Sequence, residues 1–211
     1  GSQDCPGTSC ADLLARGVTT SGAYWLSPAG GTAFRAYCDM QRNGGGWTLL
    51  MKTRGDWTFG YDANYWTQAN VLNETDLDTD DTHAAKYPAF NQLTVGELEL
   101  VFPTVAGGHV AQAPVSPRAT ALATFQSFRV ISSDTNEYPP GWPTQEHARY
   151  GLRLQHNDVS VRFGWVFNNE NDWNSPDTVA GLGCNHAGDS GYNQWYPTSR
   201  SATLRALLWG R

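Results

Sequence analysis

The sequence predicts an α+β fold in which twisted, mainly antiparallel β-sheets are accompanied by short helices. In Val159–Phe167 every second residue is apolar or aromatic, which is the period of a strand with one buried face. Thr8–Gly17 instead places Cys10, Leu13 and Leu14 on one helical face. The chain also contains 22 Gly and nine Trp among 211 residues, a composition typical of loop-rich β structure.

Taken in order, the elements begin with the helix in Thr8–Gly17, which Thr8 or Ser9 can cap and Gly17 can end. Strands are expected over Ala23–Leu26, Ala33–Met40, Trp47–Thr53, Glu97–Phe102, Phe125–Ser132, Tyr150–Gln155, Val159–Phe167 and Thr203–Trp209. Two long polar connections, Gly55–Tyr87 and Asn168–Ser201, separate them, and the second forms a loop-rich C-terminal region. Connections of this length are usually functional or ordered by a ligand.

Length and charge restrict the classes of protein that this chain can belong to. Residues 1–211 suit a single domain, in which residues 1–7 are expected to form a tail. The net charge of −6 argues against nucleic acid as a partner, because phosphate binding needs clustered Lys and Arg. No apolar run reaches the 18 or so residues that span a bilayer, so no membrane insertion is expected. The oligomeric state stays open, and an oligomer is compatible with these data.

The four cysteines, Cys5, Cys10, Cys38 and Cys184, include no CxxC pair, which removes the main support for zinc-ribbon and thioredoxin folds. An even number at wide spacing favours two disulfides, for which three connectivities are open. Disulfides indicate an oxidising compartment, so we expect a secreted, extracellular protein. Four buried thiols are the alternative.

Two short motifs resemble those of a known family. Phe34-Arg-Ala-Tyr-Cys-Asp-Met40, followed by Asn43-Gly-Gly-Gly-Trp-Thr-Leu49, is similar to the YCDM…GGGWTL motif of fibrinogen-like domains. The resemblance implies a single fibrinogen-like domain and a disulfide between Cys10 and Cys38. Cys5–Cys184 is then the remaining pair, although Cys5 could instead link two chains. Three glycines in a row suit a turn with unusual backbone angles and close approach to a buried Trp.

The last fifty residues resemble the intelectin group of lectins within this family. Val161–Glu170 looks like its F-R-V-F-N-N-E strand, Gly183-Cys184-Asn185 its G-C-N, and Gly188–Tyr192 with Trp195 its G-D-F-S-G-F-D-W. The likeness implies a calcium-dependent carbohydrate-binding protein. The implied Ca²⁺ ligands are Asn169, Glu170, Asn185, His186 and Asp189. A vicinal diol of a microbial or cell-surface glycan would replace two bound waters, contacting Asn169, Glu170 and His186 between the aromatic rings of Tyr192, Trp195 and Tyr196.

Several other interpretations stay open. The Asn and Asp residues can be turn formers and the aromatic residues plain core. A fibrinogen-like domain can bind proteins, as in adhesion molecules, or recognise acetylated sugars beside a structural calcium. Asp76–Asp81 resembles the start of an EF-hand loop, but Asp81 stands where Gly is needed, so the stretch is either an acidic turn or a looser cation site. We expect no enzyme and assign no catalytic residues, because no paired carboxylates support glycoside hydrolysis.

Overall fold

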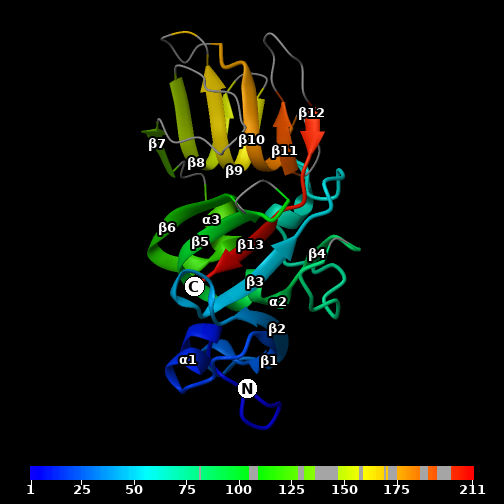
Figure 1. Ribbon diagram of the computed structural model, residues 1–211, viewed down its shortest axis with the longest axis vertical. Coiled ribbons are helices and arrows are strands. Elements are labelled where there is room, and N and C mark those ends of the chain that lie inside the picture. Colours follow the sequence, from blue (N-terminus) through cyan, green and yellow to red (C-terminus); the bar gives the residue numbers. More distant parts are fainter. Residues whose placement is uncertain are drawn as a thin grey trace.

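A computed structural model of the chain describes residues 1–80, 82–104, 109–127, 131–135, 147–156, 159–168, 170, 175–185, 190–193 and 201–211. Within these residues the strands pair into two antiparallel sheets, one of seven strands and one of six. In Figure 1 the six-stranded sheet occupies one end of the long axis, and the N-terminal strands and first helix occupy the other. The predicted α+β class with antiparallel sheets and short helices is confirmed.

The seven-stranded sheet has the order β1-β2-β3-β13-β5-β6, with β4 paired to β3 beside this path. Its strands are β1 (Gly22–Leu26), β2 (Phe34–Asp39), β3 (Trp47–Lys52), β13 (Leu207–Gly210), β5 (Thr94–Phe102), β6 (His109–Thr120) and β4 (Ala85–Lys86). The strand that comes last in the sequence therefore lies between two strands from the first half of the chain.

The six-stranded sheet has the order β12-β11-β10-β9-β8-β7. Its strands are β12 (Ser201–Thr203), β11 (Ser190–Asn193), β10 (Thr178–Cys184), β9 (Val159–Asn168), β8 (His147–His156) and β7 (Ile131–Thr135).

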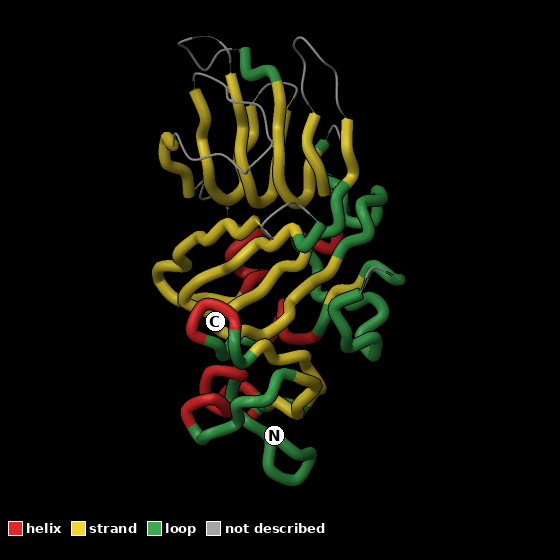
Figure 2. The backbone as a smooth tube through the Cα atoms, viewed as in Figure 1, coloured by secondary structure: helices red, strands yellow, loops and turns green. Residues whose placement is uncertain are grey.

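The helices are short, as Figure 2 shows in red. They are α1 (Cys10–Ala15), α2 (Pro88–Gln92) and α3 (Ala121–Gln126), with single 3₁₀ turns η1 (Pro28–Gly30), η2 (Arg42–Gly44) and η3 (Asn64–Trp66). None in the described part of the chain is long and apolar enough to cross a membrane.

Helix α1 is joined to the first sheet by a disulfide. The helix begins after Ser9, whose Oγ accepts a hydrogen bond from the backbone N–H of Asp12 at 3.0 Å, as an N-cap does. Cys10 in the first turn is bonded to Cys38 in β2. The predicted helix, its cap and this disulfide are confirmed.

The three-glycine turn that precedes β3 requires glycine for two physical reasons. Gly44, Gly45 and Gly46 have φ angles of 85°, 73° and 76°, in the left-handed region that side chains disfavour. A Cβ on Gly45 would also lie 2.2 Å from the Met40 carbonyl oxygen. The turn directs the fully buried Trp47 into the start of β3.

Residues 1–7, which the sequence suggests are a tail, contact strand β1 through backbone hydrogen bonds. The N–H of Gly7 donates to the Trp25 carbonyl at 3.0 Å, and the Trp25 N–H donates to the Gly1 carbonyl at 3.0 Å. Because β1 is an edge strand, its outer N–H and C=O groups need partners, and this segment supplies them.

An aromatic cluster from η3, α2 and α3 belongs to a hydrophobic core that also contains buried residues of both sheets. Trp66 contacts Phe125 with ring centroids 4.9 Å apart, and Phe90 stacks on Phe125 at 5.8 Å. Phe125 belongs to α3, so the strand predicted over Phe125–Ser132 is wrong at its start. Thr120 explains the difference, because its Oγ1 accepts from the Ala123 N–H at 3.1 Å and starts a helix in alanine-rich sequence.

A second predicted strand, near the C-terminus, also differs from the structure. The expected strand Thr203–Trp209 is divided, since β12 ends at Thr203 in one sheet and β13 begins at Leu207 in the other. The residues between them are anchored to the end of β3, where the Thr53 N–H donates to the Ala206 carbonyl at 2.8 Å.

The connection predicted as polar, Asn168–Ser201, contains the fully buried strand β10. This strand contains several small residues, Ala180, Gly181 and Gly183 among them, that allow close packing. Gly181 in β10 lies between Gly164 of β9 and Gly191 of β11, and Gly164 in turn lies beside Gly151 of β8. A Cβ on Gly164, where φ is 153°, would lie 2.1 Å from the Ala180 carbonyl oxygen. A row of glycines thus crosses four strands and lets their backbones approach closely.

The second predicted disulfide, Cys5–Cys184, is wrong. Cys5 is exposed in the segment beside β1, whereas Cys184 is buried at the end of β10 and its Sγ donates to the Gly181 carbonyl at 3.3 Å. Figure 1 shows the N-terminus and β10 at opposite ends of the molecule, so pairing by elimination had no geometric basis.

Candidate functional site

The residues predicted to bind calcium flank strands β9 and β10, which run antiparallel. At one edge of this pair Phe167 lies opposite Thr178, and near the other Val161 lies opposite Cys184. With strands rising about 3.3 Å per residue, these two levels are about 20 Å apart. Glu170, which follows β9, and Asn185, which follows β10, therefore lie at opposite ends of these strands, that is, at opposite edges of the six-stranded sheet.

Glu170 lies at the edge where β9 ends. Its backbone N–H donates to Oδ1 of the buried Asn168 at 3.1 Å, and its Oε2 accepts from the Ser175 hydroxyl at 2.8 Å. The side chain is exposed, so the carboxylate is available to solvent. This edge offers one accessible carboxylate supported by the Asn168 turn.

Asn185 lies at the other edge and forms a reciprocal pair with the start of β9. Its N–H donates to the Ser160 carbonyl at 3.1 Å, and its side-chain Oδ1 accepts from the Ser160 N–H at 2.8 Å. The neighbouring Cys184 carbonyl accepts from the Tyr61 N–H at 3.3 Å. Asn185 therefore ties β10 to β9.

The predicted calcium site as a whole stays a prediction, but Glu170 and Asn185, its two members within the described residues, do not lie close together. The physical reason is the antiparallel register of β9 and β10, which the local motifs do not encode. Tyr192 lies in β11, where its backbone is opposite Ala180 and Ala202. The other predicted residues, Asn169, His186, Asp189, Trp195 and Tyr196, lie outside the described residues.

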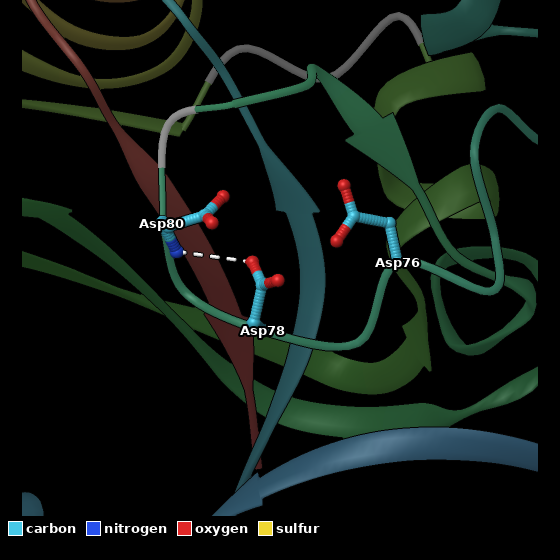
Figure 3. Close-up of side chains that lie close together, drawn as sticks. All are labelled: Asp76, Asp78 and Asp80. Carbon is cyan, nitrogen blue, oxygen red and sulfur yellow. Dashed lines mark hydrogen bonds between the residues drawn. The ribbon is translucent and has the colours of Figure 1, made fainter.

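A second group of acidic residues, Asp76, Asp78 and Asp80, lies on the connection between β3 and β4. Figure 3 shows their three carboxylates around one centre, with the Asp80 N–H donating to Asp78 Oδ1 at 3.1 Å. One oxygen from each carboxylate lies within 4.8 Å of the others. The geometry alone is compatible with a divalent cation.

The ammonium of Lys52 forms ion pairs with these three carboxylates. Lys52 is the last residue of β3, and its side chain is fully buried. Its Nζ lies 2.6 Å from Asp78, 3.2 Å from Asp76 and 3.4 Å from Asp80. One ammonium balances one of the three carboxylate charges, so the acidic turn is only partly neutralised within the protein, and the looser cation site that the sequence left open stays a prediction.

The protonation of this group follows from the same contacts. Burial lowers the pKa of Lys52, but its hydrogen bonds with Asp78 and Asp76 outweigh that effect, so the pKa is raised overall. Burial raises the pKa of Asp76, but hydrogen bonds with Asp78 and Lys52 outweigh that effect, so the pKa is lowered overall. The cluster is therefore charged at neutral pH, with a buried cation paired to partly exposed carboxylates.

A groove of about 400 Å³ was missed by the sequence reasoning. Trp25 and Arg35 line it from β1 and β2, Glu74 lines it from the connection between β3 and β4, and Pro88 and Gln92 line it from α2. The sequence indicates this groove only weakly, through an arginine that stands between the buried Phe34 and Ala36 in an alternating strand.

Comparison with known proteins supports part of the family prediction. Residues 6–72 match the model for the fibrinogen beta and gamma chains, C-terminal globular domain. Veficolin-1 from Varanus komodoensis is 42% identical over 50 residues, covering 24% of this chain and 23% of that protein. Techylectin-5A from Tachypleus tridentatus is 40% identical over 62 residues, covering 28% and 20%. Angiopoietin-2 from Homo sapiens is 43% identical over 44 residues, covering 20% and 9%.

The matched segment thus spans less than a quarter of the length of each of these relatives. Among solved structures, the fibrinogen-like globe domain of human ANGPTL6 matches with a TM-score of 0.44 and 15% identity over 98% of this chain and 96% of that one. The intelectin resemblance of residues 159–211 stays a prediction. Residues 6–72, which contain the paired cysteines and the glycine turn, are fibrinogen-like, as their motifs predict.

Proposed function

We propose that the chain is an extracellular, calcium-dependent carbohydrate-binding module and not an enzyme. Its fibrinogen-like segment supports a binding role, and one relative, Techylectin-5A, carries the word lectin in its name. The Cys10–Cys38 disulfide fits an oxidising compartment. The observation that carries the proposal is that β9 and β11 end at the same edge of the six-stranded sheet, since Thr178 pairs with Phe167 and Val179 pairs with Asn193.

In the sequence, the residues at the end of β9 and after β11 are of the two kinds that a calcium-assisted sugar site needs. Glu170 supplies an exposed carboxylate and Asn169 an amide oxygen, both of which are calcium ligands. Trp195 and Tyr196 follow the end of β11 in the sequence and supply flat rings for the carbon face of a sugar. A vicinal diol would replace two waters on the ion.

The proposed shell excludes residues at the opposite edge. Asn185 uses its Oδ1 to accept from Ser160, and it lies at the far end of β10. Ser190, opposite Leu182, begins β11 toward that same end. We therefore leave His186 and Asp189, which lie between these two residues in the sequence, out of the shell.

Calorimetric titration of calcium into paired variants tests this assignment. Glu170→Gln should weaken calcium binding tenfold or more, since it removes a charged ligand, while Asp189→Asn should leave it unchanged. The reverse pattern would place the ion at the Asn185 edge.

A glycan array with and without chelator tests the sugar chemistry. Binding should disappear with chelator and be competed by glycerol, the smallest vicinal diol. Trp195→Ala should weaken sugar binding by about 1–3 kcal/mol, taking base stacking as an analogue, without changing calcium affinity. Sugar binding that survives chelator would exclude the diol mechanism and favour an acetyl-group pocket beside a structural ion.

A protein-binding role is the second candidate, and one residue favours it. Trp57 is 64% exposed, which is unusual for an aromatic of this size. Exposed Trp residues are frequent anchors in protein interfaces. A glycan array that shows no binding in calcium, together with a partner interaction lost in Trp57→Ala, would support this role over the lectin.

A further inference from the structure

The groove beside β1 and β2 presents a cation next to an aromatic ring. Trp25 of β1 lies directly opposite Arg35 of β2, so the two side chains project from the same face of the sheet. Arg35 is exposed, whereas its neighbours Phe34 and Ala36 are buried on the other face. One wall of the groove therefore combines an accessible guanidinium with a partly buried indole.

The facing wall presents an anion on a backbone that is already fixed. Glu74 lines the groove from the connection between β3 and β4. Just before it, the Asn73 amide donates to the Ala84 carbonyl at 2.8 Å. Just after it, the Tyr87 hydroxyl donates to the Asp76 carbonyl at 2.6 Å. These two bonds position Glu74 without using its carboxylate.

Within the described part of the chain, neither charge has a side-chain partner. Among the described residues, no ion pair or side-chain hydrogen bond involves Arg35 or Glu74, although most charged groups of the seven-stranded sheet are paired, such as Glu97 with Arg211. Thr75 lines both this groove and the neighbouring pocket of Asp76, Asp78 and Asp80. The potential therefore falls from the Arg35 wall toward the acidic connection, so the groove is dipolar.

We propose that this groove binds a small zwitterionic ligand of the phosphocholine type. Its anionic group pairs with Arg35, and its ammonium lies toward Glu74 and against the face of Trp25, where a cation–π contact adds to the attraction. The ammonium of such a ligand offsets part of its phosphate charge, so the protein's net charge of −6 repels it less than it repels a bare phosphate. The volume of about 400 Å³ suits a small molecule. This inference is independent of the calcium-dependent sugar site.

An NMR titration with phosphocholine tests the proposal directly. The probe is the indole N–H signal of Trp25, assigned by its loss in Trp25→Phe. Phosphocholine should shift this signal with a saturable curve, and choline alone or inorganic phosphate alone should bind at least about threefold more weakly. If inorganic phosphate binds as tightly as phosphocholine, the groove is a simple anion site. If neutral methyl glucoside competes as well as phosphocholine, the groove is a sugar site. Either result overturns the proposal.

Two exposed substitutions separate the roles of the charges. Arg35→Gln should weaken phosphocholine binding about three- to fivefold, as expected for an exposed charge pair, and leave choline binding unchanged. Glu74→Gln should weaken phosphocholine and choline to a similar degree and leave phosphate binding unchanged. Glu170→Gln and added chelator serve as controls and should have no effect. Binding that neither variant changes, or no binding at all, refutes the proposal.

Discussion

Replacing Gly164 by alanine tests the register of β9 and β10, on which the separation of Glu170 from Asn185 depends. A Cβ at this position lies 2.1 Å from the Ala180 carbonyl oxygen and 2.6 Å from the Gly181 Cα. These contacts are with backbone, so no side-chain rotation relieves them. The φ of 153° adds a second penalty for any residue other than glycine.

The magnitude follows from these two terms. Overpacking in a close-packed region costs about 1–3 kcal/mol, and a disfavoured positive φ costs about 1–2 kcal/mol. Gly164→Ala should therefore lose about 2–5 kcal/mol of unfolding free energy. For a chain of this length each kcal/mol lowers Tm by about 2–4 °C, so a decrease of roughly 4–20 °C is expected.

Gly17→Ala is the matched control because it isolates the backbone term. Gly17 also has a positive φ, 91°, but nothing lies within 4 Å of its Cβ position. It should lose only about 1–2 kcal/mol. Both variants are compared with the parent chain by urea denaturation and thermal melting. If Gly164→Ala is no more destabilised than Gly17→Ala, the backbones of β9 and β10 do not approach as described. Their register would then no longer separate Glu170 from Asn185.

Three further predictions concern charge and covalent structure. Removing the disulfide by Cys10→Ser with Cys38→Ser should cost about 3–4 kcal/mol of unfolding free energy, by the loop-entropy relation for a separation of 28 residues. Urea denaturation measures this loss, and an unchanged free energy would mean that the disulfide does not restrict the unfolded chain. Burial lowers the pKa of Lys86 to about 8, so the unfolded chain binds more protons between pH 8 and 10.5 and stability should rise with pH there by up to about 3 kcal/mol. Lys86→Met should flatten that rise in denaturation curves, and an unchanged slope would contradict the assignment. Lys52→Met should destabilise the protein at pH 7, and its deficit in unfolding free energy relative to the parent should shrink as the pH falls from about 4 through the lowered pKa of Asp76 in the folded chain, where that carboxylate loses its charge. A deficit that stays the same across this fall in pH would assign it to packing.

The sequence predicts the fibrinogen-like segment well because its determinants are local. The Ser9 cap, the glycine turn and the alternation in β2 each depend on residues a few positions apart. Cys10–Cys38 is recognised from the same short motifs. In contrast, Lys52 ends an apolar run and shows no sign of being buried, because the carboxylates that neutralise it lie more than twenty positions downstream.

The candidate site is harder to predict because it depends on strand register. Asn168, Glu170 and Asn185 share one stretch rich in calcium-type ligands, and composition suggests that they converge. The strand between them, β10, contains two glycines and other small residues, so it shows no alternating pattern. It nevertheless runs from one end of β9 to the other and so separates the residues on either side of it. The groove at Arg35 is equally hard to predict from the sequence, since residues from separate segments of the chain line it.

The position of β13 has a consequence for how the protein folds. β3 and β5 are both complete within the first 102 residues, but they cannot pair with each other because β13 lies between them. During synthesis both strands keep an unpaired edge until residues 207–210 leave the ribosome. Such edges are templates for pairing with other chains. The seven-stranded sheet is therefore completed by a contact of high sequence separation, which slows folding and makes chaperone protection of the nascent chain valuable.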